Sequence, residues 1–84
     1  MKVSLTPNAL ADLRWWLRHD RKIADRVLAL LDECSRTPFA GTGKPEPLKF
    51  QLSGCWSRRI DREHRLIYQV EDDELVVLAC RFHY

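Results

Sequence analysis

Apolar side chains in the first part of the chain recur at the three- and four-residue spacing of amphipathic helices. The first apolar set is Leu10, Leu13, Trp16 and Leu17. The second apolar set is Ile23, Val27, Leu30, Leu31 and Cys34. Thr6 followed by Pro7, and later Asp20, are typical helix starts, because Thr and Asp accept backbone N–H bonds and proline lacks the N–H that would be unpaired there. The pattern predicts two helices that join near residues 19–20 and bury these two sets.

Strand patterns dominate the rest of the chain. Segments 55–60, 65–70 and 75–82 carry apolar and β-branched residues, and polar clusters separate them, which predicts an antiparallel meander. A further short strand is expected over residues 2–5. The resulting order β-α-α-β-β-β predicts an α+β fold, in which a helical hairpin packs on one face of a small, largely antiparallel sheet.

The faces of the last two predicted strands indicate their register. A three-residue loop, Asp72 to Glu74, places Glu71 opposite Leu75. One face of the strand pair is then uniformly apolar, which a slip of one residue would destroy. Its members are Leu66, Tyr68, Val70, Val76, Leu78, Cys80 and Phe82. The same register places Arg65 and His83 together on the opposite, polar face.

Length and composition limit the chain to one small globular domain, residues 1–84, with 45% hydrophobic and 31% charged residues. The stretch TPFAGTGKPEP, residues 37–47, holds three of the four prolines and two of the three glycines, so neither a helix nor a regular strand is expected there. No apolar run is long enough to span a membrane, and the first residues lack a signal-peptide pattern. We therefore expect a cytoplasmic protein.

Several kinds of chemistry find no support in the motifs. The three cysteines are odd in number and form no CxxC pair, so we expect buried, reduced thiols rather than disulfides or a zinc site. Neither a nucleophile elbow nor a glycine-rich phosphate loop is present, and the three histidines are scattered. We expect no metal and no cofactor.

Positive charge is concentrated in the middle of the chain. The net charge is +2, but residues 36–65 hold seven Lys and Arg against three acidic residues. Residues 66–84 hold one Arg against four acidic residues. A basic centre suits a polyanion such as nucleic acid, although a solvated surface that only aids solubility explains the same charge.

Residues for RNA cleavage are nevertheless present. When a ribose 2′-hydroxyl attacks its neighbouring phosphate, a base, a cation and an acid suffice, and a carboxylate, a guanidinium and an imidazole supply them. Glu46 lies between two prolines that keep its backbone extended. The ordinary explanation is a solvated loop carboxylate, strand arginines at positions 58, 59 and 65 that face outward, and a surface histidine at position 83. The residues alone leave both explanations open.

A family resemblance favours the first explanation. The stretch TPFAGTGKPEPLKFQLSGCWSRRIDREHRLIYQV, followed by LACRFHY, resembles the YoeB/Txe toxins of bacterial toxin–antitoxin pairs, within the RelE/ParE superfamily. The match is dense from Arg36 to Tyr84, whereas the helical half agrees in length and pattern. The resemblance implies a RelE-like microbial ribonuclease fold. It also implies a ribosome-dependent endoribonuclease that cuts translated mRNA in the ribosomal A site without a metal.

The resemblance assigns the catalytic roles. Glu46 in KPEP looks like the general base, Arg65 in EHRL like the phosphate-stabilising cation, and His83 like the general acid. Tyr84 completes the implied site. 

Two further residues, Lys49 in PLK and Arg59 in SRR, are similar to residues near the scissile phosphate or the adjoining RNA. The chain departs from the family at Cys55, where an aromatic residue is usual, and at Phe82, where tyrosine is common. Neither departure removes a catalytic group.

The resemblance also implies partners: a YefM/Phd-like antitoxin, the ribosome with its mRNA, and a second copy in a homodimer when the toxin is free. Two alternatives belong to other classes. Some RelE/ParE relatives poison DNA gyrase, and a copy without catalysis would be only a binding module. Gyrase-directed members generally lack the set Glu46, Arg65, His83 and Tyr84, so its presence here favours the ribonuclease.

Overall fold

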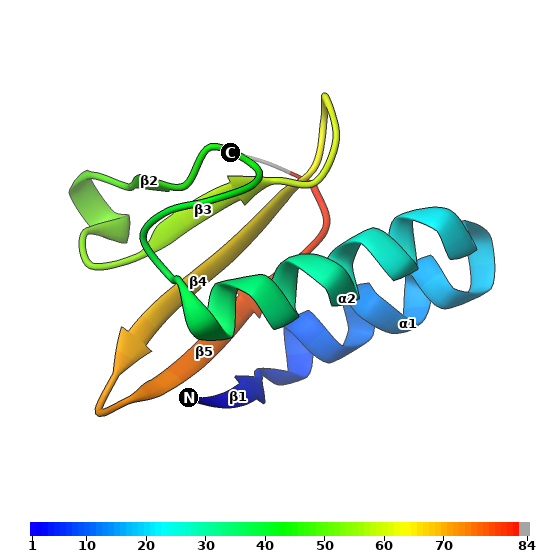
Figure 1. Cartoon of the computed structure of the whole chain (residues 1–84). Helices are drawn as coiled ribbons and strands as arrows, with labels where there is room; N and C mark the ends of the chain where they lie inside the picture. Colours follow the sequence, from blue (N-terminus) through cyan, green and yellow to red (C-terminus); the bar gives the residue numbers. More distant parts are fainter. Residues whose placement is uncertain (83–84) are drawn as a thin grey trace.

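The structure is a computed structural model that describes residues 1–82 (Figure 1). Its elements are β1 (Lys2–Leu5), α1 (Pro7–His19), α2 (Arg21–Arg36), β2 (Glu46–Pro47), the 3₁₀ helix η1 (Phe50–Leu52), β3 (Trp56–Arg59), β4 (Arg65–Glu71) and β5 (Glu74–Ala79). The α+β order predicted from the sequence is confirmed. One short strand, β2, was not expected, because it lies at the end of the proline- and glycine-rich stretch.

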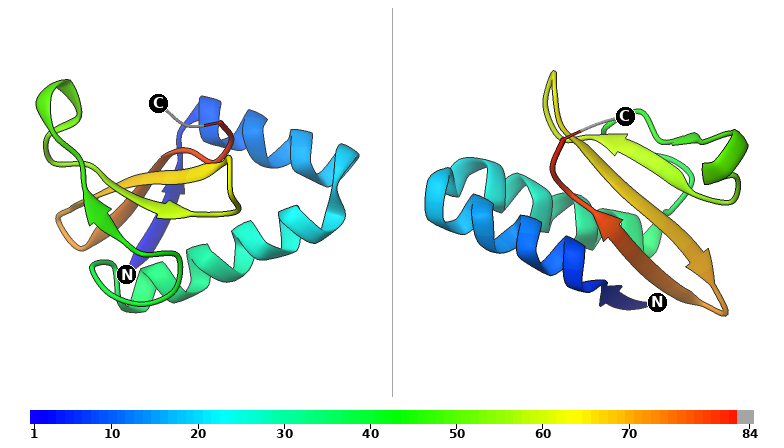
Figure 2. Two further views of the ribbon diagram at one scale, coloured as in Figure 1. Left: turned by 90° about the horizontal axis from the view of Figure 1, so that it is seen from above. Right: turned by 180° about the vertical axis from the view of Figure 1, so that it is seen from behind.

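The five strands form one mixed sheet in the order β1-β5-β4-β3-β2. β1 runs parallel to β5, and the other neighbours are antiparallel. The helical hairpin lies on one side of this sheet (Figure 2). The opposite side, which we call the open face, carries no helix.

Both helix starts agree with the prediction. The Thr6 side chain accepts a hydrogen bond from the Ala9 N–H at 3.1 Å, and Pro7 opens α1. Asp20 serves both helices, because its N–H donates to the Trp16 carbonyl at 2.8 Å while its carboxylate accepts from the Ile23 N–H at 3.2 Å. This double use explains why α1 and α2 are separated by a single residue.

The core lies between the hairpin and the covered sheet face. Its largest members are Leu13, Trp16, Val27, Leu30, Leu31, Ile60, Leu66, Tyr68, Leu75 and Val77. The apolar set predicted for α2 is buried, except that Ile23 is half-buried. The set predicted for α1 was partly wrong: Leu10 is 48% and Leu17 39% exposed, because the buried stripe is centred on Ala9, Leu13 and Trp16.

The predicted three-residue loop between β4 and β5 was also wrong. Glu71 pairs with Glu74, so the loop is Asp72-Asp73, and both have positive φ, 49° and 62°. Positive φ at both loop positions is the geometry of a two-residue hairpin turn whose twist suits the strands, and aspartate tolerates it.

A β-bulge corrects the register further along the hairpin. Tyr68 pairs with Val77 but Ile67 pairs with Ala79, so Leu78 is the additional residue. The core therefore takes Leu75 and Val77 rather than Val76 and Leu78, and takes Cys80 beyond the bulge. The sequence pattern could not reveal this, because alternation assumes one unbroken register. The bulge changes the register within the strand, so Leu75 and Val77 share the face of Tyr68 before it and Cys80 shares the face of Leu66 after it.

The three cysteines are buried and free, as expected. Burial raises the pKa of the Cys80 thiol to about 12 and also raises the pKa of Cys34, so both stay protonated near neutral pH. Neither helix within residues 1–82 has the length and hydropathy needed to cross a bilayer.

Candidate active site

Two neighbouring arginines in β3 point to opposite sides of the sheet. Successive residues of a strand alternate between faces, and residues paired across strands share a face. Arg58 pairs with the core residue Leu66 and is fully buried, whereas Arg59 pairs with Arg65 and is exposed on the open face. The prediction that strand arginines face outward is therefore wrong for Arg58.

The open face brings together three of the predicted site residues. Glu46 in β2 pairs with Ser57, which lies two residues before Arg59 in β3. Arg65 pairs with Arg59 from β4, so all three charged residues share the open face. This grouping joins the proline-flanked carboxylate to the arginine pair, although 19 positions separate Glu46 from Arg65 in the chain.

The strand geometry fixes the spacing of the open-face residues. Adjacent strands lie about 4.8 Å apart and residues rise about 3.3 Å, so the Cα atoms of Glu46 and Arg65 lie about 12 Å apart. Long side chains from both ends can meet within that gap. Among residues 1–82, neither Arg59 nor Arg65 makes an ion pair, so their positive charge is not neutralised by a described carboxylate.

The turn before β4 holds the Arg65 side chain. The Arg65 Nη1 group donates to the carbonyls of Asp61 and His64, each at 3.2 Å. The Asp61 carboxylate closes the turn by accepting the N–H groups of Glu63 and His64 at 2.9 and 2.6 Å. Burial opposes ionisation of Asp61, but these N–H bonds lower its pKa below the ordinary value. Both bonds come from Nη1, so they hold the guanidinium in place. The N–H groups on Nε and Nη2 are not used in these two bonds.

The segment after β5 is fastened beside Arg65. The Arg65 N–H donates to the Phe82 carbonyl at 2.9 Å, and the Phe82 N–H donates to His64 Nδ1 at 2.7 Å. Two residues before Phe82, the Cys80 N–H donates to the Asp12 carboxylate at 3.0 Å, and Trp16 Nε1 donates to the Cys80 carbonyl at 2.7 Å. The chain is thus anchored from both α1 and the β4 turn up to Phe82.

The predicted general acid His83 and its neighbour Tyr84 lie outside the described residues. Their assignment, and the shared polar face predicted for Arg65 and His83, remain predictions. What the structure adds is the position of Phe82, the residue that precedes them.

Lys49 lies apart from the arginine pair. Leu48 N–H bonds to the Cys55 carbonyl at 2.9 Å, which extends the β2–β3 pairing away from Arg59 and places Lys49 on the other side of Glu46. Next to Lys49, Phe50 exposes 85% of its surface. Phe50 was not among the residues predicted for the site; an aromatic residue that directly follows a lysine in a loop was the available signal.

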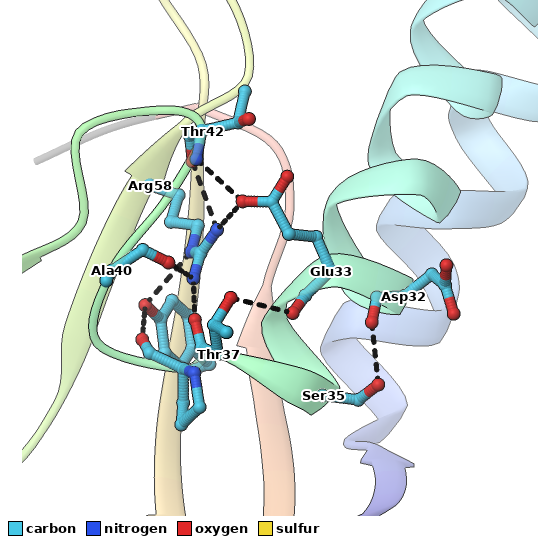
Figure 3. A network of polar contacts seen from close by, with 9 residues as sticks. Asp32, Glu33, Ser35, Thr37, Ala40, Thr42 and Arg58 are labelled. Atoms are coloured by element: carbon cyan, nitrogen blue, oxygen red, sulfur yellow. Dashed lines mark hydrogen bonds and ion pairs between the residues drawn. The ribbon is translucent and has the colours of Figure 1, made fainter.

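Buried Arg58 is the centre of a polar network on the covered face (Figure 3). Its guanidinium donates to the carbonyls of Ala40 and Thr42 at 2.8 and 3.1 Å, and to the carbonyl of Thr37. It also forms an ion pair with Glu33 at 2.7 Å. These contacts fasten the stretch between α2 and β2 to the sheet.

Further hydrogen bonds of Glu33 and Tyr68 complete this network. The Glu33 carboxylate accepts the Thr42 N–H at 2.6 Å, and Tyr68 Oη donates to the Pro38 carbonyl at 2.6 Å while accepting from Arg58 Nε at 3.3 Å. The Thr42 bond and then Arg58 lower the pKa of Glu33. Burial raises the pKa of Tyr68 to about 12, so the phenol remains a donor at neutral pH.

Gly43 explains how the stretch reaches β2. Its φ is +88°, and its carbonyl accepts the Arg59 N–H at 2.7 Å. A Cβ at this position would lie 2.9 Å from the Arg59 carbonyl oxygen. Only glycine combines this φ with so close an approach, and three residues later the chain delivers Glu46 to the open face.

Within residues 1–82, no group of three or more His, Cys, Asp or Glu side chains gathers closely enough to hold a metal ion. The described open face presents the carboxylate of Glu46 and the guanidinium groups of Arg59 and Arg65. 

Comparisons with known proteins identify the relatives of this chain. The family description "YoeB-like toxin of bacterial type II toxin-antitoxin system" matches residues 5–84. Toxin YoeB of Mycobacterium bovis is 54% identical over 82 residues, 98% of this chain and 96% of that protein. Toxin YoeB of Escherichia coli K12 is 49% identical over the full length of both chains, 84 residues.

Solved structures show the same fold. A YoeB/ParE toxin from Agrobacterium tumefaciens superimposes with a TM-score of 0.97 at 45% identity and covers 100% of both chains. A YoeB dimer from Staphylococcus aureus gives 0.91 at 36% identity, covering 100% of this chain and 98% of the other. A sequence match over nearly the whole chain and the same architecture lead to one conclusion: this chain belongs to the YoeB-like toxins of bacterial type II toxin–antitoxin systems.

Proposed function

We propose that this protein is a ribosome-dependent endoribonuclease that cleaves translated mRNA in the ribosomal A site. Glu46 is the general base, Arg65 stabilises the phosphate charge, and His83 is the general acid, with Tyr84 completing the site. Arg59 and Lys49 bind RNA beside the scissile phosphate. Phe50, with its exposed ring, offers a stacking surface for a base.

The proposed reaction needs no metal or cofactor. Glu46 removes the proton of the ribose 2′-hydroxyl, whose oxygen attacks the adjacent phosphorus. Arg65 stabilises the added negative charge, because a planar guanidinium matches phosphate oxygens. The bond to the 5′-oxygen then breaks, and His83 supplies that oxygen with a proton. The products are a 2′,3′-cyclic phosphate and a 5′-hydroxyl.

The observation that carries this proposal is the pairing of Glu46, Arg59 and Arg65 on the open face, with Phe82 bonded to the Arg65 backbone. The bond holds Phe82, the residue that precedes His83 in the sequence, beside Arg65. A binding module would need neither a carboxylate nor a fastened segment at that point.

The same proposal includes partners. Staphylococcus aureus YoeB has been solved as a dimer and in a heterotetrameric complex with YefM. By analogy, this protein forms a homodimer when free and is neutralised by a YefM/Phd-like antitoxin. Its substrate complex is the ribosome with a bound message.

The experiment is primer extension on a reporter mRNA with purified ribosomes. We expect cuts within A-site codons, 3′ ends that carry a cyclic phosphate or its opened phosphate, and losses of about 10²–10⁴-fold for Glu46→Gln and His83→Gln. Glu71→Gln is the matched control, because Glu71 is an exposed carboxylate at the far end of β4. A 3′-hydroxyl product would exclude the mechanism. Inhibition of gyrase supercoiling without mRNA cleavage would favour the gyrase-directed alternative.

A further inference from the structure

Phe82 has a backbone conformation that residues with a Cβ atom rarely adopt. Its φ is +66°, in the left-handed region. A residue keeps such a conformation only when its surroundings hold it there, and residues of this kind cluster at functional sites. Phe82 directly precedes His83 in the sequence, so whatever holds its backbone bears on the proposed general acid.

Two hydrogen bonds to adjacent residues hold this backbone. The Phe82 N–H donates to His64 Nδ1 at 2.7 Å, and the Phe82 carbonyl accepts the Arg65 N–H at 2.9 Å. Any residue except proline at position 65 could supply the second bond, because it comes from the backbone. The first bond needs an acceptor atom on a side chain. Among residues 1–82, His64 is the one side chain that hydrogen-bonds the Phe82 backbone.

The His64 ring is fixed in position and in tautomer. Its side chain is 13% exposed and meets the Trp16 ring edge to face, with the ring centres 4.8 Å apart. The His64 N–H donates to the Asp61 carboxylate and the His64 carbonyl accepts the Ile60 N–H at 2.9 Å, so the backbone that carries the ring is held as well. Because Nδ1 accepts the Phe82 N–H, the ring proton lies on Nε2.

The other contacts of this segment act before Phe82. Bonds from α1 hold Cys80, and the Arg81 guanidinium carbon lies 3.6 Å from the centre of the Trp15 ring. The Phe82 side chain itself is 54% exposed, so packing contributes little to its position. The turn that carries His64 therefore provides the last hold on the described chain before residue 83.

We propose that His64 is a positioning residue of the candidate active site. By holding Phe82, it sets where the general acid His83 meets the leaving 5′-oxygen, and it acts through the chain rather than on the RNA. The proposal rests on the proposed function and adds a residue to it. Since His64 and Arg65 are adjacent, one turn fixes both the phosphate-stabilising cation and the chain that leads to the acid.

The expected effect of losing this hold follows from the geometry of proton transfer. A general acid must come within about 2.6–3.2 Å of the atom that receives its proton. A displacement of about 1 Å can cost about 10²-fold in rate. The loss of the bond at Phe82 should therefore slow the chemical step and leave the binding of ribosomes and message nearly unchanged. 

Two substitutions separate the acceptor atom from the ring. His64→Phe keeps a flat ring beside Trp16 but has no acceptor, whereas His64→Asn loses the ring but places Oδ1 as many bonds from Cβ as Nδ1 was. In single-turnover cleavage of ribosome-bound mRNA, we expect His64→Phe to lose about 10²-fold in rate with KM nearly unchanged. His64→Asn should recover most of that loss. The opposite order would mean that only the packing of the ring matters, and a wild-type rate for His64→Phe would overturn the inference while the proposed function stands.

A double variant tests whether His64 acts through His83. In a His83→Gln background, His64→Phe should cause no further loss, because the group that it positions is already absent. The same further loss in both backgrounds would contradict the proposal.

Amide hydrogen exchange provides a readout that does not depend on cleavage. We expect the Phe82 amide to be protected in the wild type and in His64→Asn, and to lose protection in His64→Phe. The amides of Leu66 and Val77 in the sheet serve as controls and should stay protected in all three proteins. Equal exchange of the Phe82 amide in the three proteins would refute the hold by His64. If exchange follows the expected order but the wild type cuts no mRNA, the proposed function fails while the hold on Phe82 stands.

Discussion

Arg58 and Arg59 are adjacent in the sequence and identical in chemistry, yet they belong to two different regions of the molecule. Arg58 is fully buried among three carbonyls, a carboxylate and a phenol on the covered face. Arg59 is exposed on the open face beside Arg65 and has no ion pair within residues 1–82. The first is used to build the fold, and the second remains available for a ligand.

The surroundings of each guanidinium decide whether it stabilises the fold or remains free to bind a ligand. A buried charge is stable only when its desolvation is offset by an ion pair and hydrogen bonds, and Arg58 has both. An exposed guanidinium keeps its hydration and its forked donors for a phosphate. The two regions are also linked in sequence, because the loop that Arg58 fastens leads directly to Glu46.

The largest expected effect comes from Arg58→Gln. Gln cannot replace the ion pair with Glu33 together with the bonds to three loop carbonyls, and the loss of two hydrogen bonds of a charged group costs about 3–6 kcal/mol. We expect a loss of that size in the free energy of unfolding, measured by urea denaturation. Arg59→Gln is the matched control and should unfold like the wild type. Equal stability of the two variants would contradict the assignment of Arg58 to the fold.

Arg65→Gln should have the next largest effect, on catalysis rather than folding. Loss of a group that stabilises transition-state charge costs about 10²–10³-fold in rate. We expect such a loss in single-turnover cleavage of ribosome-bound mRNA, whereas the urea midpoint changes little because only the bonds to the Asp61 and His64 carbonyls are lost. A folded Arg65→Gln variant with full cleavage rate would remove Arg65 from the site.

Arg59→Gln should have a smaller effect on the same reaction. Arg59 lies opposite Arg65 but one strand nearer to Glu46, and an exposed contact to RNA is worth about 1.4 kcal/mol, or tenfold. We expect KM to rise by about that factor while kcat falls less. If kcat falls as strongly as in Arg65→Gln, the two arginines form one catalytic unit instead of a catalytic and a binding residue.

The smallest effect concerns Glu33 and pH. Its pKa is lowered in the folded protein from an ordinary value of 4.5, first by the Thr42 N–H and then by Arg58. Its contribution to stability is therefore complete above about pH 4.5 and is lost as the pH falls toward the folded pKa. We expect urea midpoints of the wild type to fall between pH 5 and pH 3 more steeply than those of Glu33→Gln. Parallel curves would show that the Arg58 network does not depend on this charge.

Local signals made the helices predictable. Thr6, Pro7 and Asp20 act within one or two turns of the chain, so their capping role could be inferred without knowledge of the fold. The stripe of α2 was predictable for the same reason. The stripe of α1 was less so, because the buried stripe includes the small residue Ala9, whereas the larger Leu10 and Leu17 lie at its side and are exposed.

The candidate site, too, was predictable only in part. The residue types Glu46, Arg59 and Arg65 could be named from the sequence, mostly because their motifs resemble a family. The separation of Arg58 from Arg59 could not, since alternation says only that neighbours face opposite sides and not which side the helices cover. Phe50 was missed because exposure is a property of the folded chain.

From the amino-acid sequence alone, the order of the helices and longer strands, the helix caps, the charge of the central segment and the family could be inferred. These depend on residues that are close in the chain or on motifs read in order. The short strand β2, the two-residue turn with its bulge, the buried network around Arg58 and the contact of Arg81 with Trp15 could be seen only in the folded structure. Most of these depend on groups far apart in the chain, such as Trp15 with Arg81 or Glu33 with Arg58, whose contact energies exist only once the sheet and helices have packed together.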